Sequence, residues 1–351
     1  MNAILSSKPH SFLEAARNYN ALTKPGIIRL LVLTTVCTML VAEKGIPSFG
    51  LMFWTVLGTA LVSGSANTFN MVWDQDIDKV MNRTAHRPLV TGAIVQRNAL
   101  IFGIVTGALG VGLLLTFANP LAALMGVCGH AFYVLIYTMW LKRRTPQNIV
   151  IGGAAGAFPP LIGWAAVTND LNLTAWLIFA IIFLWTPPHF WALALYKDIE
   201  YGKAHIPMMP NVQGKRSTKL QMLLYLMLLI GATTLLTVTG TMGIIYFVSS
   251  VILGGGFVYF CVKTAFDDSP EQTWAKKTFG YSIVYLALLF GAMSLDSVTT
   301  LHFTQQNYLT SIEHEAAKIR SRQTLEEKQR LHNETDPTGG SEATSAERKP
   351  R

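Results

Sequence analysis

Nine long blocks of apolar residues dominate this sequence and limit what it can fold into. A helix that crosses a bilayer needs about 20 mostly apolar residues, and each block is close to that length. The blocks cover roughly residues 27–43, 50–72, 97–117, 119–140, 148–168, 172–195, 219–240, 243–264 and 278–301. Because a segment in lipid must satisfy its own backbone hydrogen bonds, we predict an all-α polytopic membrane protein with nine transmembrane helices.

The composition excludes the other broad classes. Charged residues make up only 14% of the chain and hydrophobic residues 51%, whereas soluble domains are about one quarter charged. A disordered chain needs low hydrophobicity and high net charge, so it is excluded too. Cys37, Cys128 and Cys261 lie far apart in apolar runs, without metal or disulfide spacing, and we interpret them as buried apolar residues.

Two blocks contain proline pairs, Pro159-Pro160 and Pro187-Pro188. A proline pair breaks a helix in water, but in a membrane bundle neighbouring helices can satisfy the backbone groups that are freed. Kinks at these positions also make room between helices. We therefore predict a central cavity within the bundle.

The basic residues lie in alternate loops. Nineteen of the 28 Lys and Arg residues are in the N-terminal segment and the loops after the second, fourth, sixth and eighth blocks, and the opposite loops carry only Lys44. The positive-inside rule places the basic side, and the opening of the cavity, in the cytoplasm. The N-terminus lacks a signal-peptide layout, and Glu14 fits a transit peptide poorly, so we expect a bacterial inner membrane. The net charge of +8 then reflects topology and not nucleic-acid binding.

The C-terminal end does not follow this pattern. Nine spans place it outside, yet residues 305–351 carry eight Lys or Arg residues and as many Asp or Glu residues. An eight-span alternative would leave it inside. We expect a charged helix over 309–332 and disorder over 333–351. The predicted organisation is a cytoplasmic segment at 1–21, a membrane domain at 22–304 and a polar, partly disordered tail at 305–351.

Asn70, Asp74 and Asp78 are spaced four apart where the second block ends. On a helix they project from nearly one face, with Asp76 pointing away. Two carboxylates one turn apart repel each other unless a cation lies between them, and oxygen ligands of this kind suit Mg²⁺. The alternative is a solvated loop paired with nearby Lys and Arg, but polar groups at membrane depth are costly and favour a functional role.

A second polar stretch follows the sixth block. His189, Tyr196 and Glu200 fall on one helical face, and Asp198 lies well away from Glu200. We favour Glu200 as the carboxylate that this stretch contributes to the same pocket, with Asp198 in reserve. His189 is either a hydrogen-bonded packing residue or a substrate contact.

Basic residues lie in loops on the same side of the membrane as the acidic stretches. Lys142, Arg143 and Arg144 follow the fourth block, and Arg83 and Arg87 follow the first acidic stretch. Three cations in a row either anchor a helix to lipid headgroups or hold a phosphate group. Their position on the acidic side of the membrane makes a phosphate site a candidate.

These motifs resemble the UbiA superfamily of intramembrane prenyltransferases, and in particular its haem-prenylating branch. The Asn70 to Asp78 spacing marks the superfamily. The haem branch is marked by the stretch Gly152-Gly-Ala-Ala-Gly to Trp164 and by Trp185-Thr-Pro-Pro-His189. Further matches run from Leu22-Thr-Lys-Pro-Gly to Ile206-Pro-Met-Met-Pro. Glu200 stands where the resemblance expects Asp, and the tail lies outside it.

The resemblance implies transfer of a farnesyl group from farnesyl diphosphate to a vinyl group of haem B, with addition of water, giving haem O and diphosphate. It also implies Mg²⁺ as cofactor, with haem A synthase or oxidase assembly factors as candidate partners. The implied metal ligands are Asn70, Asp74, Asp78 and Glu200, with Asp198 and Tyr196 beside them as catalytic residues. The implied diphosphate-binding residues are Arg83, Arg87, Lys142, Arg143, Lys197 and Tyr137. The implied haem contacts are His189, Trp164 and Trp191.

The ring faces of aromatic side chains could stabilise an allylic carbocation through cation–π contact. The candidates are Trp73, Tyr137, Trp185, Trp191 and Tyr196. Three alternatives stay open: a prenyltransferase for an aromatic or quinone precursor, a cation transporter, and a structural assembly factor. A transporter would place its carboxylates near the bilayer midplane, whereas these lie at a helix end.

Overall fold

The computed structural model describes residues 11–299, 319–320 and 323, and this part of the chain contains helices and no strand. Nine of the described helices are long and apolar enough to cross a membrane, as predicted. They are α2 (Pro25–Glu43), α3 (Phe49–Trp73), α6 (Gln96–Phe117), α7 continued by η1 (Pro120–Ala131 and Phe132–Leu141), α8 continued by α9 (Asn148–Gly152 and Ala154–Thr168), α10 (Leu173–Tyr196), α12 (Met209–Val238), α13 (Ile244–Ala265) and a last helix, Thr273–Thr299. The short helices are α1 (Phe12–Leu22), α4 (Gln75–Val80), α5 (Pro88–Thr91) and α11 (Asp198–Lys203).

Local chemistry sets where the long helices begin. The Asn119 and Asn172 side chains accept hydrogen bonds from the backbone N–H of Ala122 (2.8 Å) and Ala175 (3.2 Å), which are N-cap interactions. The last helix begins earlier than predicted because Asp267 accepts the backbone N–H of Trp274 at 2.8 Å. Helix α12 also begins earlier, since polar turns precede a break at Gly214, whose φ of +81° suits glycine.

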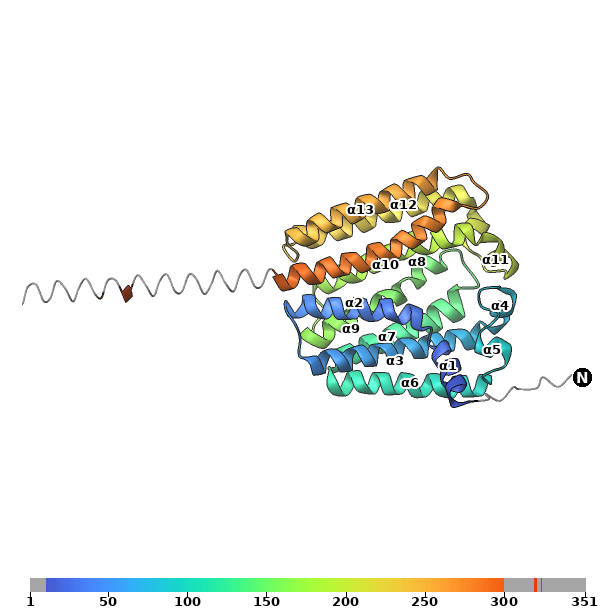
Figure 1. Ribbon diagram of the computed structural model, residues 1–351, viewed down its shortest axis with the longest axis horizontal. Helices are drawn as coiled ribbons and strands as arrows, with labels where there is room; N and C mark the ends of the chain where they lie inside the picture. Colours follow the sequence, from blue (N-terminus) through green and yellow to red (C-terminus); the bar gives the residue numbers. More distant parts are fainter. Residues whose placement is uncertain (1–10, 300–318, 321–322, 324–351) are drawn as a thin grey trace, which may run out of the picture. The chain divides into compact units, whose positions relative to one another are not determined.

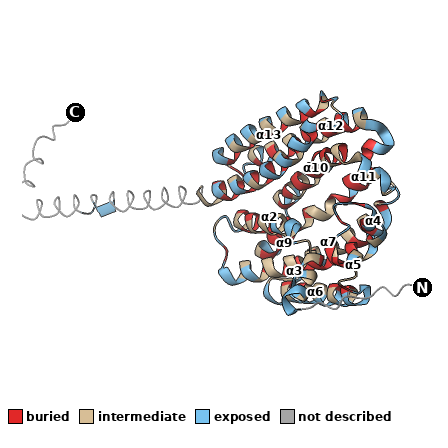
Figure 2. Cartoon of the chain, turned by 45° about the vertical axis from the view of Figure 1, so that its right-hand side comes forward, coloured by how far each residue is buried: buried red, intermediate tan, exposed pale blue. Residues whose placement is uncertain are grey.

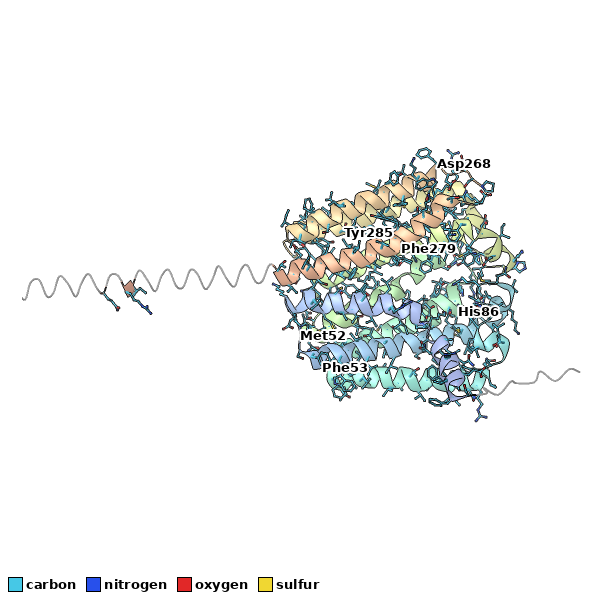
Figure 3. All side chains as sticks on the ribbon, viewed as in Figure 1. Met52, Phe53, His86, Asp268, Phe279 and Tyr285 are labelled. Carbon is cyan, nitrogen blue, oxygen red and sulfur yellow. The ribbon has the colours of Figure 1, made fainter. Side chains whose placement is uncertain are left out.

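The long helices run side by side, and the connections separate into two ends (Figure 1). Helices α4, α5 and α11 lie together at one end. His86 and Asp268 are at that same end, whereas Met52 and Phe53 are at the other (Figure 3). The acidic and basic loops therefore share one end of the bundle, as the alternation of basic loops predicts.

Helices α9 and α10 form the interior of the bundle, and α6 and α13 present apolar side chains outward (Figure 2). Both interior helices contain a proline pair. The Thr35 hydroxyl donates to the Pro159 carbonyl at 3.3 Å, and the Thr186 hydroxyl donates to the Ile182 carbonyl at 2.8 Å. Both helices thus continue through their proline pairs, and a threonine hydroxyl lies beside each pair.

Helix η1 is a π-helix, with hydrogen bonds from residue i+5 to residue i, such as Lys142 N–H to the Tyr137 carbonyl at 2.9 Å. Ten consecutive residues in this form are unusual, and π-turns are frequent at functional sites. This segment carries Tyr133, Tyr137 and Thr138 toward the acidic end of α3. The predicted tail from 305 lies outside the described residues except for 319–320 and 323, as do residues 1–10 of the N-terminal segment.

Candidate active site

A cavity of about 490 Å³ lies within the bundle and reaches the end that carries α4 and α11. Its deeper wall is apolar, with Leu30, Ile182, Phe279 and Leu286 among its residues. The polar and charged residues that line it are Lys24, Thr34, Ser63, Asn67, Asn70, Asp78, Arg83, Thr84, Arg87, His130, Tyr133, Tyr137, Lys142, Asn148, Thr186, His189 and Tyr201. Such a space suits a ligand with a charged head and a long apolar body.

The Asn70, Asp74 and Asp78 side chains share one side of the chain although the helix is interrupted between them. Helix α3 ends at Trp73, and α4 begins at Gln75. The hydrogen bonds nevertheless continue, from Asp74 N–H to the Asn70 carbonyl (3.0 Å) and from Asp78 N–H to the Asp74 carbonyl (2.8 Å). The Asn70 amide group donates to Asp74 Oδ2 at 2.9 Å and to Thr138 Oγ1 of η1 at 3.0 Å.

Each of these three polar groups faces a cation. Lys142 Nζ donates to Asp74 Oδ2, Arg87 Nη1 donates to Asp78 Oδ2 at 2.5 Å, and Lys24 Nζ donates to Asn70 Oδ1 at 2.5 Å. Both carboxylates are buried. A buried charge is tolerated when it is paired and hydrogen-bonded, and these pairs let Asp78 line the cavity. Asp74 does not line it but is bonded to Asn70 and Lys142, which do.

One of the two carboxylate oxygens of Asp74 makes no hydrogen bond. Its Oδ1 atom is buried without a hydrogen-bond partner, and Arg143 Nη2 lies 3.9 Å from it. A buried, unpartnered carboxylate oxygen is unusual, and it fits a metal ligand. Between residues 11 and 299 no three His, Cys, Asp or Glu residues form a metal-binding group. Two carboxylates agree with Mg²⁺, because Mg²⁺ commonly combines one or two carboxylates with substrate phosphates and water.

The pKa values of two groups at this end of the bundle, Lys24 and Asp76, are lowered by their surroundings. Burial, with the nearby Arg87 and Lys142 cations, lowers the pKa of Lys24 to about 7. Asp76 points away from the cavity as predicted, and its hydrogen bonds to the Arg143 guanidinium hold its pKa below the usual range. Arg143 is accordingly engaged outside the cavity wall, by Asp76.

The second polar stretch is divided between the cavity and the surface. His189 lines the cavity, whereas Tyr196, Asp198 and Glu200 do not. Asp198 pairs with Lys215 at 2.9 Å, and Glu200 Oε1 pairs with Lys197 Nζ at 2.6 Å. Glu200 Oε2 is buried without a hydrogen-bond partner. The expected common face of these residues is interrupted because α10 ends at Tyr196 and α11 begins at Asp198.

His189 is held by an aromatic stack and a hydroxyl. Its ring lies between Trp185 (centroids 4.2 Å apart) and Phe279 (4.5 Å). Its Nδ1 atom is 2.6 Å from Ser282 Oγ, and that hydroxyl is 2.7 Å from the Phe279 carbonyl oxygen. The hydroxyl proton lies between the two oxygens, so His189 Nδ1 carries a proton and Nε2 keeps its lone pair.

Several residues predicted for the site lie elsewhere. Trp164 and Trp191 are buried in the helix packing and do not line the cavity, and Trp73 is exposed on the outside. Of the predicted aromatic groups, Tyr137 and Trp185 line it. A period of 3.6 residues identifies a helical face, but it does not say which neighbour covers that face.

The sequence reasoning also missed residues on the wall, namely Lys24, His130, Tyr133, Asn148 and Tyr201. His130 and Tyr133 carried a usable signal, since they are polar residues within an apolar block. Lys24 carried a weaker one, because its position before Pro25 resembles an ordinary helix start.

Comparisons with known proteins agree with this geometry. The UbiA prenyltransferase family matches residues 30–291. The chain is 51% identical over 283 residues to a protein of Symbiobacterium thermophilum named protoheme IX farnesyltransferase, covering 81% of this chain and 95% of that protein. Among solved structures, a digeranylgeranylglyceryl phosphate synthase superposes with a TM-score of 0.69 at 18% identity, over 82% of this chain and 99% of that one. A UbiA homologue from Archaeoglobus fulgidus bound to DMAPP and Mg²⁺ superposes with a TM-score of 0.57 at 15% identity, over 79% and 99%.

Proposed function

The chain belongs to the UbiA prenyltransferase family, and on that premise we propose that it transfers a farnesyl group from farnesyl diphosphate to a vinyl group of haem B. Water adds in the same reaction, and the products are haem O and diphosphate. The observation that carries this proposal is the 51% identity to a named protoheme IX farnesyltransferase across nearly the whole of that relative. The cavity, charged at one end and apolar in its depth, fits both substrates.

The charged end of the cavity would hold the diphosphate. Lys24, Arg83, Arg87 and Lys142 line it together, and preorganised cations stabilise the negative charge that develops on a leaving diphosphate. Tyr137 lies at the same end. Arg143 and Lys197, which we expected here, are engaged by Asp76 and Glu200, so we give them supporting roles.

Mg²⁺ is the cofactor that the family implies, and the residues present fit it. Asn70, Asp74 and Asp78 would hold one ion, and the unpartnered Asp74 Oδ1 supports this assignment. Glu200 is the fourth ligand that the resemblance implies, and its unpartnered Oε2 supports that role, with Asp198 in reserve. A bound Mg²⁺ supplies Lewis-acid neutralisation of the leaving diphosphate.

Two features of the apolar wall would protect the allylic carbocation. Tyr133, Tyr137 and Trp185 line the cavity, and an aromatic face stabilises a desolvated cation by about 2 kcal/mol. The apolar residues around them limit the access of water, which would otherwise quench the cation early. Tyr133 and Tyr137 are stacked with centroids 5.4 Å apart, so they form a continuous aromatic surface.

His189 is the haem contact that the geometry supports best. Its Nε2 lone pair is available, and its Nδ1–H is fixed by Ser282. An imidazole whose second nitrogen donates a hydrogen bond is the usual form of a metal-ligating histidine. We further propose that the acidic end faces the cytoplasm of a bacterial inner membrane, because the basic loops gather at that end.

The test is to incubate membranes that contain the protein with haem B, labelled farnesyl diphosphate and Mg²⁺. We expect label in a porphyrin product whose mass corresponds to haem B plus one farnesyl group and one hydroxyl group. Label that reaches a hydroxybenzoate or quinone precursor, and never haem, would refute the assignment of the acceptor.

A further inference from the structure

We propose that His130, positioned by Ser65, is the base that accepts the proton of the water added to haem, an inference that rests on the proposed function. His130 is at the end of α7, where the chain continues into the π-helix, and it lines the cavity. Of the histidines between residues 11 and 299, only His130 and His189 line the cavity.

Ser65 determines which nitrogen of His130 is available. Ser65 Oγ is 2.6 Å from the Gly103 carbonyl oxygen and 3.0 Å from His130 Nε2. Two oxygens at 2.6 Å need a proton between them, so the Ser65 hydroxyl donates to Gly103. The hydroxyl can then only accept from His130, which places the ring proton on Nε2 and leaves the lone pair on Nδ1.

The surroundings keep the imidazole in this orientation. Phe69 presents its ring edge-on to His130, with centroids 5.6 Å apart and planes at 85°. Gly107 makes room for the pair, since a Cβ atom there would lie 2.7 Å from Ser65 Oγ. His130 is therefore a preoriented neutral base.

The reaction needs one such base. The allylic C–O bond of farnesyl diphosphate breaks, and its electron pair leaves with diphosphate. The vinyl π pair then forms the new C–C bond, which leaves a cation on the vinyl carbon attached to the porphyrin. Water adds to that carbon through its oxygen and must lose one proton. We assign this proton to Nδ1 of His130.

The other groups on the wall are less suited to the task. Asp78 and the neighbouring Asp74 are paired with Arg87 and Lys142. Lys24 is bonded to Asn70 Oδ1 at 2.5 Å at the charged end, and Arg83, Arg87 and Lys142 are cations. His189 presents Nε2, which is unhindered and suits an iron atom. Nδ1 of His130 adjoins the ring carbon that carries Cβ, so it is more hindered toward a haem iron than Nε2 of His189.

The experiment compares the products of the full-length wild type and of His130→Gln in membranes supplied with haem B, farnesyl diphosphate and H₂¹⁸O. Without His130, the porphyrin-side cation instead loses a proton from the adjacent carbon to the released diphosphate, which gives an alkene. We expect the hydroxylated product to fall about a hundredfold, with farnesylated haem that is lighter by one water appearing in its place. His189→Gln is the matched control, and it should weaken haem binding without changing the ratio of the two products.

Three results would overturn the inference. One is an unchanged ratio of hydroxylated to dehydrated product in His130→Gln. Another is loss of diphosphate release while haem still binds, because the residue would then act before water is added. If His130→Gln does not accumulate in membranes, Ser65→Ala replaces it, and an unchanged ratio in that variant overturns the inference as well. A wild type that farnesylates no haem would instead refute the proposed function.

Discussion

The two acidic loops look alike in sequence but are built differently. Each follows a long helix and carries carboxylates, yet Asp74 and Asp78 of the first loop are buried and Asp78 lines the cavity, while α11 of the second has no buried residue. The first loop is held by groups from other helices, namely Thr138 and Lys142 at the end of the fourth span. In the second, Glu200 pairs with Lys197 only three residues away. Long-range partners, more than acidic residues, distinguish a built site from a charged surface.

The largest expected effect is on the first loop. Asp74→Asn and Asp78→Asn should each reduce diphosphate release about a thousandfold, because they remove a charged ligand and leave a buried cation unpaired. Asp76→Asn is the matched control, since Asp76 is exposed and points outward. Release assays on membranes with equal protein content measure the difference. Equal losses in all three variants would contradict the prediction that the buried carboxylates matter more than the exposed one.

A smaller effect is expected when the support of the first loop is disturbed. A Cβ atom at Gly152 would lie 2.2 Å from the Tyr137 ring, so Gly152→Ala must displace η1 and its contacts to Asn70 and Asp74. A shift of about 1 Å can reduce a rate about a hundredfold. Gly112→Ala adds a methyl group to α6 where nothing lies within 4 Å and away from the cavity wall, and it should stay near the wild-type rate. Similar rates for the two variants would argue against the role of η1.

The second loop should respond more weakly. Glu200→Gln should raise the Mg²⁺ concentration needed for half-maximal rate about tenfold, because its unpartnered oxygen is available to a metal. Asp198→Asn should change it less, since Asp198 is paired with Lys215. Mg²⁺ titrations of the transfer rate separate the two. A larger effect from Asp198 would reverse our preference for Glu200.

The smallest effect is expected at the surface of this loop. Lys215→Met removes a partly exposed ion pair, and such pairs contribute about 1 kcal/mol or less. The transfer rate and the thermal stability in detergent should both stay close to those of the wild type. A large loss of stability would show that α11 depends on this pair.

Much of this arrangement could be predicted from sequence, and the reasons are physical. Nine apolar blocks define nine spans because the bilayer tolerates few alternatives. The spacing of Asn70, Asp74 and Asp78 places them together even though the helix is interrupted at Asp74. The prediction was weaker for Tyr196 and Glu200, because the break after α10 turns them away from the cavity. Trp164 and Trp191, which the resemblance implied as haem contacts, are buried in the helix packing and do not line the cavity. A motif match does not identify which neighbouring helix covers a side chain.

The π-helix at Phe132–Leu141 has a consequence for how this enzyme can tolerate change. Each π-turn takes more residues than an α-turn, so ten residues advance through a smaller total rotation. Removing a single residue from this segment would leave its hydropathy and its ability to span the bilayer almost unaltered. It would nevertheless swing Thr138 and Lys142 around the helix axis and away from their acidic partners. A chain that lacks one residue here would therefore still insert into the membrane, but it would no longer hold its substrate.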